Sequence, residues 1–206
     1  IRLGGETIYT AVQISKLQEA LGKLGFTIPE IRAATDGVVA LAQATGEDLA
    51  QSANISGIMI RAFGLNASEL TRVVDVMAKS FNTSALDLEK FRETMKFVAP
   101  VAEAAGYTIE ETTTIMAKLA DIGVSGSLAG TSLRNMMLRL TDANSKLSKA
   151  FGFTAKSLPD LIMGLTMLRD RGIDATKALE LTDRRQAQHF VILAFALFIP
   201  AIHGQA

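Results

Sequence analysis

The sequence predicts an all-α protein, built as a compact array of short antiparallel helices joined by glycine-capped tight turns. Apolar residues recur with a helical period along most of the 206-residue chain, and one glycine-containing junction occurs five times. Hydrophobic residues make up 49% of the chain but aromatic residues only 6%, with no Trp. Ala, Leu, Ile, Val and Met must therefore fill the interior, which favours helix-on-helix packing.

The helical period is visible in successive segments, where apolar residues stand three to five positions apart. No run of strict alternation is long enough to predict a strand. Helix starts, kinks or ends are expected at Pro29, Pro100, Pro159 and Pro200. The residues that carry the period are Ile8, Val12, Leu17, Leu21 and Leu24, then Leu70, Val73, Val74 and Met77, then Leu88, Phe91, Met95 and Val98, and finally Ile115, Met116 and Leu119.

The repeated junction predicts a helix end joined directly to a helix start. Residues 25–30 (GFTIPE) recur as residues 106–111 (GYTIEE), with looser copies at 64–69, 152–157 and 172–177. Glycine adopts the left-handed conformation past the last turn, and the next apolar residue packs back on the helix it leaves. Thr, Asn or Asp then caps the following helix. Capping boxes are predicted for three pairs, Thr27 with Glu30, Asn66 with Glu69, and Thr108 with Glu111.

The two best junctions begin at residues 25 and 106, 81 positions apart, which suggests a duplicated helical unit. We expect one helical unit over residues 1–82, a second over 83–189, and an apolar C-terminal segment over 190–206. General helix–turn–helix patterning without duplication would give the same pattern, and that alternative stays open.

The C-terminal segment is more continuously apolar than the rest of the chain. Phe190–Ile202 is a 13-residue apolar run interrupted by Pro200, shorter than the roughly 20 residues that span a bilayer. We expect a buried terminal helix, and a membrane-active segment is the alternative. The first residue is Ile and no signal peptide is visible, so the chain is expected to be a fragment or a processed product.

Composition argues against several function classes. The chain has 21 basic and 21 acidic residues, and a protein that binds phosphate backbones normally shows a basic excess. Disulfides and thiolate metal sites are absent because there is no Cys. His189 and His203 have no carboxylate beside them in the sequence, so both are expected to be solvated or helix-terminal rather than metal ligands or members of a triad.

Three other groups of residues could form sites, and each has a simpler explanation. The glycine-rich stretch 123–131 lacks the Lys-Ser/Thr pair of a phosphate loop, and Ser125 or Ser127 is expected to cap a helix over 128–140. A run of four basic residues, with Asp142 as its only acid, is expected to be a solvated helix face. Four carboxylates have no apolar residues placed to enclose them, so nothing indicates a raised pKa. We therefore predict no catalytic, cofactor-binding or metal site, and no enzyme. The basic residues are Arg134, Arg139, Lys146 and Lys149, and the carboxylates are Glu103, Glu110, Glu111 and Asp121.

Several segments in a fixed order carry a family resemblance. They are residues 67–78 (ASELTRVVDVMA), 82–89 (NTSALDLE), 97–102 (FVAPVA), 106–112 (GYTIEET) and 126–134 (GSLAGTSLR). Over roughly residues 1 to 190 the chain resembles the core region of tail tape-measure proteins, also called minor tail proteins, of tailed phages and prophages. The apolar run after Phe190 departs from the family pattern.

The resemblance implies a structural module of the virion that acts in tail-length determination, tail assembly and DNA ejection across the host envelope. The implied partners are the tail tube protein, tail-tip or baseplate proteins, tail assembly chaperones, further copies of the chain and the host membrane during ejection, with no specific nucleic-acid site. The implied locations are the lumen of the tail tube, the host cytoplasm during assembly, and the host envelope on ejection. The alternatives are a cellular helical scaffold or adaptor, and a membrane-perturbing helical protein.

Overall fold

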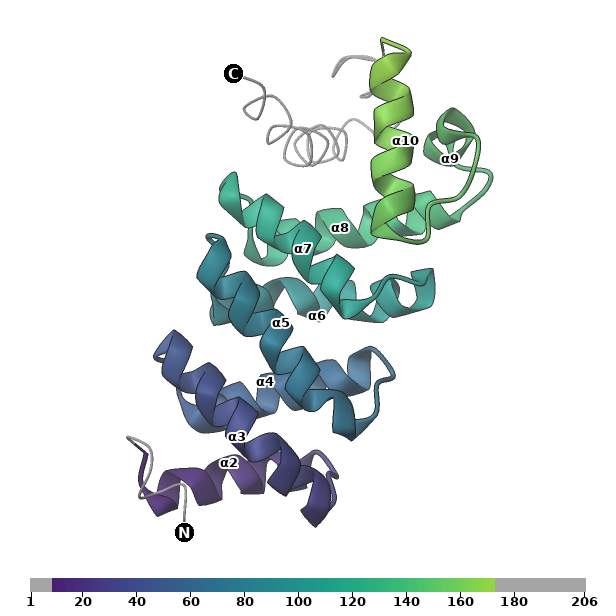
Figure 1. The fold of residues 1–206 in the computed structure, drawn as a ribbon. Helices are drawn as coiled ribbons and strands as arrows, with labels where there is room; N and C mark the ends of the chain where they lie inside the picture. The colour runs from purple at the N-terminus through teal and green to yellow at the C-terminus, as the bar shows by residue number, and fades with distance from the viewer. Residues whose placement is uncertain (1–8, 173–206) are drawn as a thin grey trace. The chain divides into compact units, whose positions relative to one another are not determined.

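The computed structural model describes residues 9–172, and within that range the chain is helical with no strand, so the all-α prediction is confirmed (Figure 1). Short turns join successive helices. The elements are α2 (Ala11–Lys23), α3 (Ile28–Thr45), α4 (Leu49–Ala62), the 3-10 turn η1 (Ala67–Glu69), α5 (Leu70–Thr83), α6 (Leu88–Ala105), α7 (Ile109–Asp121), α8 (Gly126–Thr141), α9 (Lys146–Phe151) and α10 (Leu158–Asp170).

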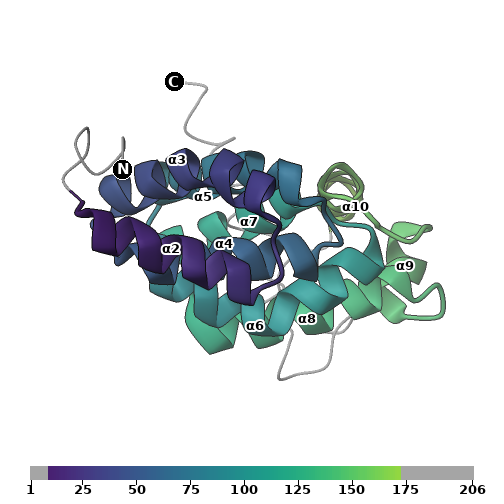
Figure 2. The same ribbon diagram turned by 90° about the horizontal axis from the view of Figure 1, so that it is seen from below.

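The chain divides into two compact units, Ile1–Thr83 and Ser84–Ala206. In the first unit each helix packs mainly against the helix that follows its immediate successor, so α2 lies beside α4 and α3 beside α5. Figure 2 shows these pairs as two layers. In the second unit α6 lies beside α8 in the same way, and α10 packs against α9 and α7. The sequence did not predict this next-but-one packing, because periodicity identifies the apolar face of a helix but not its partner.

The glycine turns form as predicted, but at 152–157 the cap of the next helix is Ser157 and not Thr154, because α10 begins only at Leu158. The five glycines have positive φ angles: Gly25 81°, Gly64 60°, Gly106 91°, Gly152 86° and Gly172 68°. The N–H of Phe26 donates to the carbonyl of Leu21 (3.2 Å), and that of Tyr107 to Ala102 (2.9 Å), as in a Schellman motif. The helix start expected after Gly172 lies outside the described residues.

All three predicted capping boxes are present. The backbone N–H of Thr27 donates to Glu30 (2.7 Å), that of Asn66 to Glu69 (2.9 Å), and that of Thr108 to Glu111 (2.9 Å). The Thr27 N–H, together with the Thr27 hydroxyl, lowers the pKa of the Glu30 carboxyl. Each box satisfies backbone donors that a helix start would otherwise leave unpaired.

The expectation for Ser125 is only half right. Ser125 is the N-cap residue of α8, but its side chain makes no capping hydrogen bond, and the helix begins at Gly126 rather than Leu128. Gly126 has a φ of +62°, which departs from helical geometry at the position where the cap must form. Among the prolines, Pro29 and Pro159 stand in first turns and Pro100 lies inside α6, while Pro200 is outside the described residues.

Most of the residues that carry the helical period are buried in the core. Val12 is an exception, since 66% of it is exposed and Ile14 takes the inward position on α2. Ile8 lies outside the described residues. The residues of the helical period that are buried are Leu17, Leu21, Leu70, Val73, Val74, Met77, Leu88, Phe91, Met95, Val98, Ile115, Met116 and Leu119.

Helix α3 offers a matched test of the glycine junctions. Gly46, its C-cap, has a φ of +73° with open space around it, whereas a Cβ added at Gly37, inside the helix, would have no neighbour closer than 3.9 Å. We expect Gly46→Ala to lower the free energy of unfolding by about 1 kcal/mol, because an L side chain is strained there. Gly37→Ala should raise it by about 0.5–1 kcal/mol through helix propensity. Denaturant unfolding followed by circular dichroism measures both, and shifts of the same sign would contradict this account.

Candidate functional site

The described residues contain no group of three or more His, Asp or Glu side chains placed to hold a metal ion. His189 and His203 lie outside the described range. None of the helices between residues 9 and 172 combines the length and hydrophobicity needed to cross a bilayer. The polar clusters of this part of the chain are better explained by the contacts that they make within the fold.

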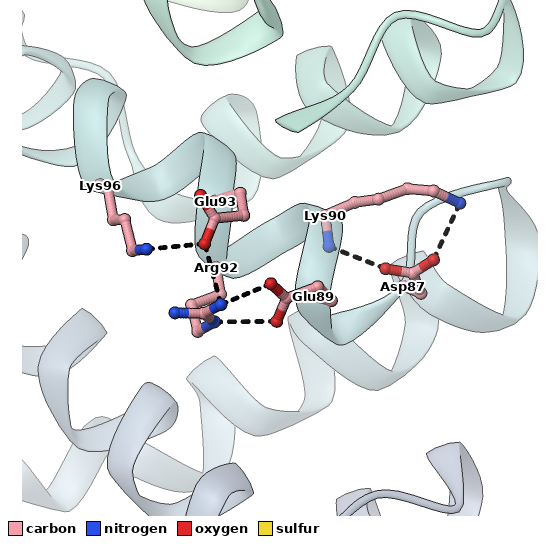
Figure 3. Close-up of polar contacts among 6 residues, drawn as sticks. All are labelled: Asp87, Glu89, Lys90, Arg92, Glu93 and Lys96. Carbon is pink, nitrogen blue, oxygen red and sulfur yellow. Dashed lines mark hydrogen bonds and ion pairs between the residues drawn. The ribbon is translucent and has the colours of Figure 1, made fainter. Parts of the chain in front are cut away.

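Charged side chains around the first half of α6 form two groups of ion pairs, Asp87 with Lys90, and Glu89, Arg92, Glu93 and Lys96 together (Figure 3). Asp87 pairs with Lys90 (2.8 Å), and Glu93 with Lys96 (2.6 Å). Arg92 pairs with Glu89, and its guanidinium lowers the pKa of that carboxyl. Because acids and bases balance and the pairs are largely exposed, they stabilise the helix slightly and leave no excess charge for a substrate or partner.

The glycine-rich stretch is the place where α8 crosses α6. A Cβ at Gly130 would lie 2.8 Å from the Thr94 carbonyl oxygen and 2.9 Å from Phe97 Cδ2. The Thr94 hydroxyl donates to the carbonyl of Gly126 (3.1 Å). One of the segments that carry the family resemblance, residues 126–134, is therefore a packing surface that brings two helix backbones together.

Two other helix glycines make room for a side chain of a neighbouring segment, and none of the three packing roles was predicted from the sequence. A Cβ at Gly57 would lie 2.5 Å from Leu24 Cδ1, where α4 meets the end of α2, and a Cβ at Gly164 would overlap the Phe151 ring, where α10 meets α9. The available signal was glycine inside a strongly helical pattern, where its low helix propensity has to be offset by a packing gain.

Two of the four carboxylates singled out from the sequence bind backbone amides distant in the chain. Glu111 accepts the N–H of Thr108 with Oε2 and the N–H of Leu158 with Oε1 (2.9 Å each), which ties the start of α7 to the start of α10. Asp121 accepts the N–H of Ala85 (2.9 Å) at the chain segment before α6. Glu103 is exposed on α6. Glu111 and Asp121 therefore act in helix capping and loop attachment.

The two junctions 106–111 and 152–157 lie against each other in the second unit. The Tyr107 side chain is buried, and its hydroxyl donates to the Ala155 carbonyl (3.3 Å). Burial raises the pKa of Tyr107. A Cβ at Gly106 would lie 3.3 Å from the Lys156 carbonyl oxygen. Two copies of the repeated sequence pattern thus form one packed contact.

The basic run is largely a solvated surface, as expected. Arg134 on α8 and Lys146 and Lys149 on α9 are exposed, whereas Arg139 is half-buried. The backbone carbonyl of Arg139 accepts the hydroxyls of Ser145 (2.6 Å) and Ser148 (3.1 Å), which fixes the turn between α8 and α9.

Several large apolar side chains are exposed. In the second unit they fall on three helices and one helix end, and the two on α10 are adjacent. These residues are Phe97, Ile122, Leu128, Leu138, Ile162 and Met163.

Comparison with known proteins identifies the family. The model of the phage-related minor tail protein family matches residues 1–193. The chain belongs to this family. It is 33% identical over 194 residues to the tape measure protein of Pneumococcus phage Dp-1, covering 94% of this chain and 17% of that protein. It is 30% identical over 145 residues to the probable tape measure protein of Escherichia phage P2, covering 70% of this chain and 18% of that protein.

The predicted resemblance to tape-measure proteins is thereby confirmed. The chain spans less than a fifth of the length of either relative. No solved structure matches it.

The crossing of α6 and α8 predicts that Gly130 does not tolerate a side chain. We expect Gly130→Ala to lower the free energy of unfolding by about 1–3 kcal/mol, because the methyl group meets backbone that cannot move away. Thr131→Ala, at the exposed neighbouring position, should change stability by less than about 0.5 kcal/mol. Thermal or denaturant unfolding measures both. A stabilised Gly130→Ala variant, as helix propensity alone requires, would show that the crossing is loose.

The double role of Glu111 predicts that its loss weakens two helix starts together. We expect Glu111→Ala to cost about 1–2 kcal/mol, because the amides of Thr108 and Leu158 both lose an acceptor. Hydrogen exchange should accelerate at the start of α10 as well as of α7. Glu103→Ala provides the control on an exposed glutamate of α6. If exchange changes only at α7, the link to α10 is not formed in solution.

Proposed function

We propose that this chain is a folded helical module of a tape-measure protein, which acts in tail assembly and tail-length determination and leaves the tail with the DNA during ejection. The observation that carries the proposal is the family match over residues 1–193. Two relatives from phages of different hosts bear the tape-measure name. A cellular scaffold or adaptor, the alternative suggested by the sequence, has no comparable support.

The helix lengths argue that the described residues form a folded module and not the ruler itself. The longest described helices, α3 and α6, have 18 residues each. At 1.5 Å per residue each spans about 27 Å before the chain turns back, whereas 206 residues in one helix would span about 300 Å. A ruler gains most length per residue from continuous helix. This module is therefore suited to packing or docking and not to measuring length by its own extent, and we propose that it contributes to tail-length determination as a folded unit of the longer protein.

The partners follow from the position of a tape-measure protein in a tail. We infer that the module meets the tail tube protein, tail-tip or baseplate proteins and tail assembly chaperones, and that several copies associate. The exposed apolar residues Phe97, Leu128 and Leu138 of the second unit supply contact area for such association. The module would occupy the tail lumen in the virion, the host cytoplasm during assembly and the host envelope on ejection. Duplication of a unit over residues 1–82 and 83–189 remains part of this proposal.

Mass spectrometry of purified particles tests the role. Trypsin cleaves after Lys96 and Lys118 and releases residues 97–118, which contain the FVAPVA and GYTIEET segments. We expect this peptide in intact, density-purified particles and its loss from particles that have ejected their DNA, with the tail tube protein as an internal standard. A peptide that is absent from complete virions overturns the tape-measure role. If the peptide is present in intact particles and remains after ejection, only the proposed release with the DNA is overturned.

A further inference from the structure

The solvent side of the α6 and α8 pair carries a patch of apolar side chains. On α6, Phe97 is 37% exposed, and the exposed Pro100 and Ala104 follow it three and seven positions later, on the same side of the helix. On α8, Leu138 is 48% exposed. These four residues, with the half-buried Val101, are called the α6–α8 patch below. Adjoining exposed apolar residues of this kind mark a contact surface.

The close contact between the two helices determines which residues of α8 stand beside which residues of α6. A Cβ at Gly126 would lie 4.0 Å from Glu93 Cβ, and a Cβ at Gly130 would lie 2.9 Å from Phe97 Cδ2. The two contacts are four residues apart on both helices, so α6 and α8 run parallel and keep the same register from turn to turn.

A base and an acid border the patch on its two sides. Arg134 is exposed and comes one turn after Gly130, so it stands beside Val101, at the α8 side of the patch. Glu103, also exposed, lies at the other side, because Pro100 and its neighbours separate it from Val101 around the helix. Residues 101 and 103 differ in height by only about 3 Å along the helix axis. The two charges therefore flank the patch at nearly the same level.

Neither of these charges is paired within the fold. The charged side chains of the first half of α6 pair with one another. By contrast, the Glu103 and Arg134 side chains form no ion pair or hydrogen bond with any residue that the structure describes. The chain as a whole has a formal net charge of zero, so two copies do not repel each other. An acid and a base of the same chain, one on each side of an apolar patch, make this surface complementary to itself.

We propose that the α6–α8 patch is the contact surface for a second copy of this chain, related to the first by a two-fold axis that passes through the patch between Glu103 and Arg134. A two-fold axis pairs residue i with residue j and j with i. Glu103 of each copy therefore meets Arg134 of the other, and the apolar residues between them pack together. The place of this contact in a tail rests on the proposed function, whereas the contact itself is a property of the purified chain.

Charge reversal in the full chain tests the pairing. We expect sedimentation equilibrium of the unmodified chain, in low salt, to show a reversible dimer. Glu103→Arg and Arg134→Glu should each raise the dissociation constant at least about tenfold, because each brings like charges together at both ends of the patch. In an equimolar mixture of the two variants every contact again joins opposite charges, so dimers should return. Their return also shows that both variants are folded.

Two matched controls separate the patch from general surface effects. Lys149→Glu makes the same charge change as Arg134→Glu on an exposed residue of α9, and it should leave the dissociation constant unchanged. Leu138→Ala should weaken the dimer several-fold, whereas Ile162→Ala should not, although Ile162 on α10 is 42% exposed. Circular dichroism checks that each variant keeps its helix content.

Three results overturn the proposal. They are an unmodified chain that stays monomeric up to about 1 mM, where weak contacts are populated, a dimer that neither charge reversal weakens, and a mixture of the two variants that does not associate. Each of these leaves the tape-measure role untouched, since the peptide measurement on purified particles tests that role separately. Conversely, a peptide that is absent from virions removes the tail from the account and leaves the measured dimer as it is.

Discussion

The reversal of the backbone at glycine is the constraint on which the helical arrangement depends. A positive φ at Gly25, Gly64, Gly106 and Gly123 lets the following amide return to the last turn of the helix, so that carbonyls at the helix end are satisfied. The next helix then starts within a few residues and must run back. Because each short turn reverses the chain direction, every second helix runs the same way. Helices related in this way lie side by side, as α2 and α4 do, and α6 and α8.

Close backbone approach converts that arrangement into a packed core with few aromatic side chains. At Gly130 a methyl group would meet the Thr94 carbonyl oxygen at 2.8 Å, so α8 packs nearer to α6 than a larger residue would permit. At Gly57 the absence of a side chain leaves room for the Leu24 side chain. Methionines fill the remaining space, among them Met77 and Met95, which are almost completely buried. The segment 126–134, which carries part of the family resemblance, thus meets a packing requirement that is visible in this chain alone.

Features with a local cause could be predicted from the sequence, and features with a distant partner could not. The capping boxes at Thr27, Asn66 and Thr108 need only residues three positions apart, and all three are present as predicted. Asp121 stood out in the sequence only as a carboxylate, but its hydrogen bond to Ala85 joins residues 36 positions apart, which no pattern in the sequence indicates. Val12 satisfies the helical period and is nevertheless exposed, because the neighbouring face of α2 is the one that meets α4.

The next-but-one packing also has a kinetic consequence. Helix ends close through hydrogen bonds between residues five positions apart, such as Phe26 with Leu21, and the main helix contacts join elements separated by a single intervening helix. Chains dominated by such local contacts fold quickly, because little loop-closure entropy is lost before contacts form. A unit of this kind is therefore expected to recover its structure rapidly after it has been unfolded.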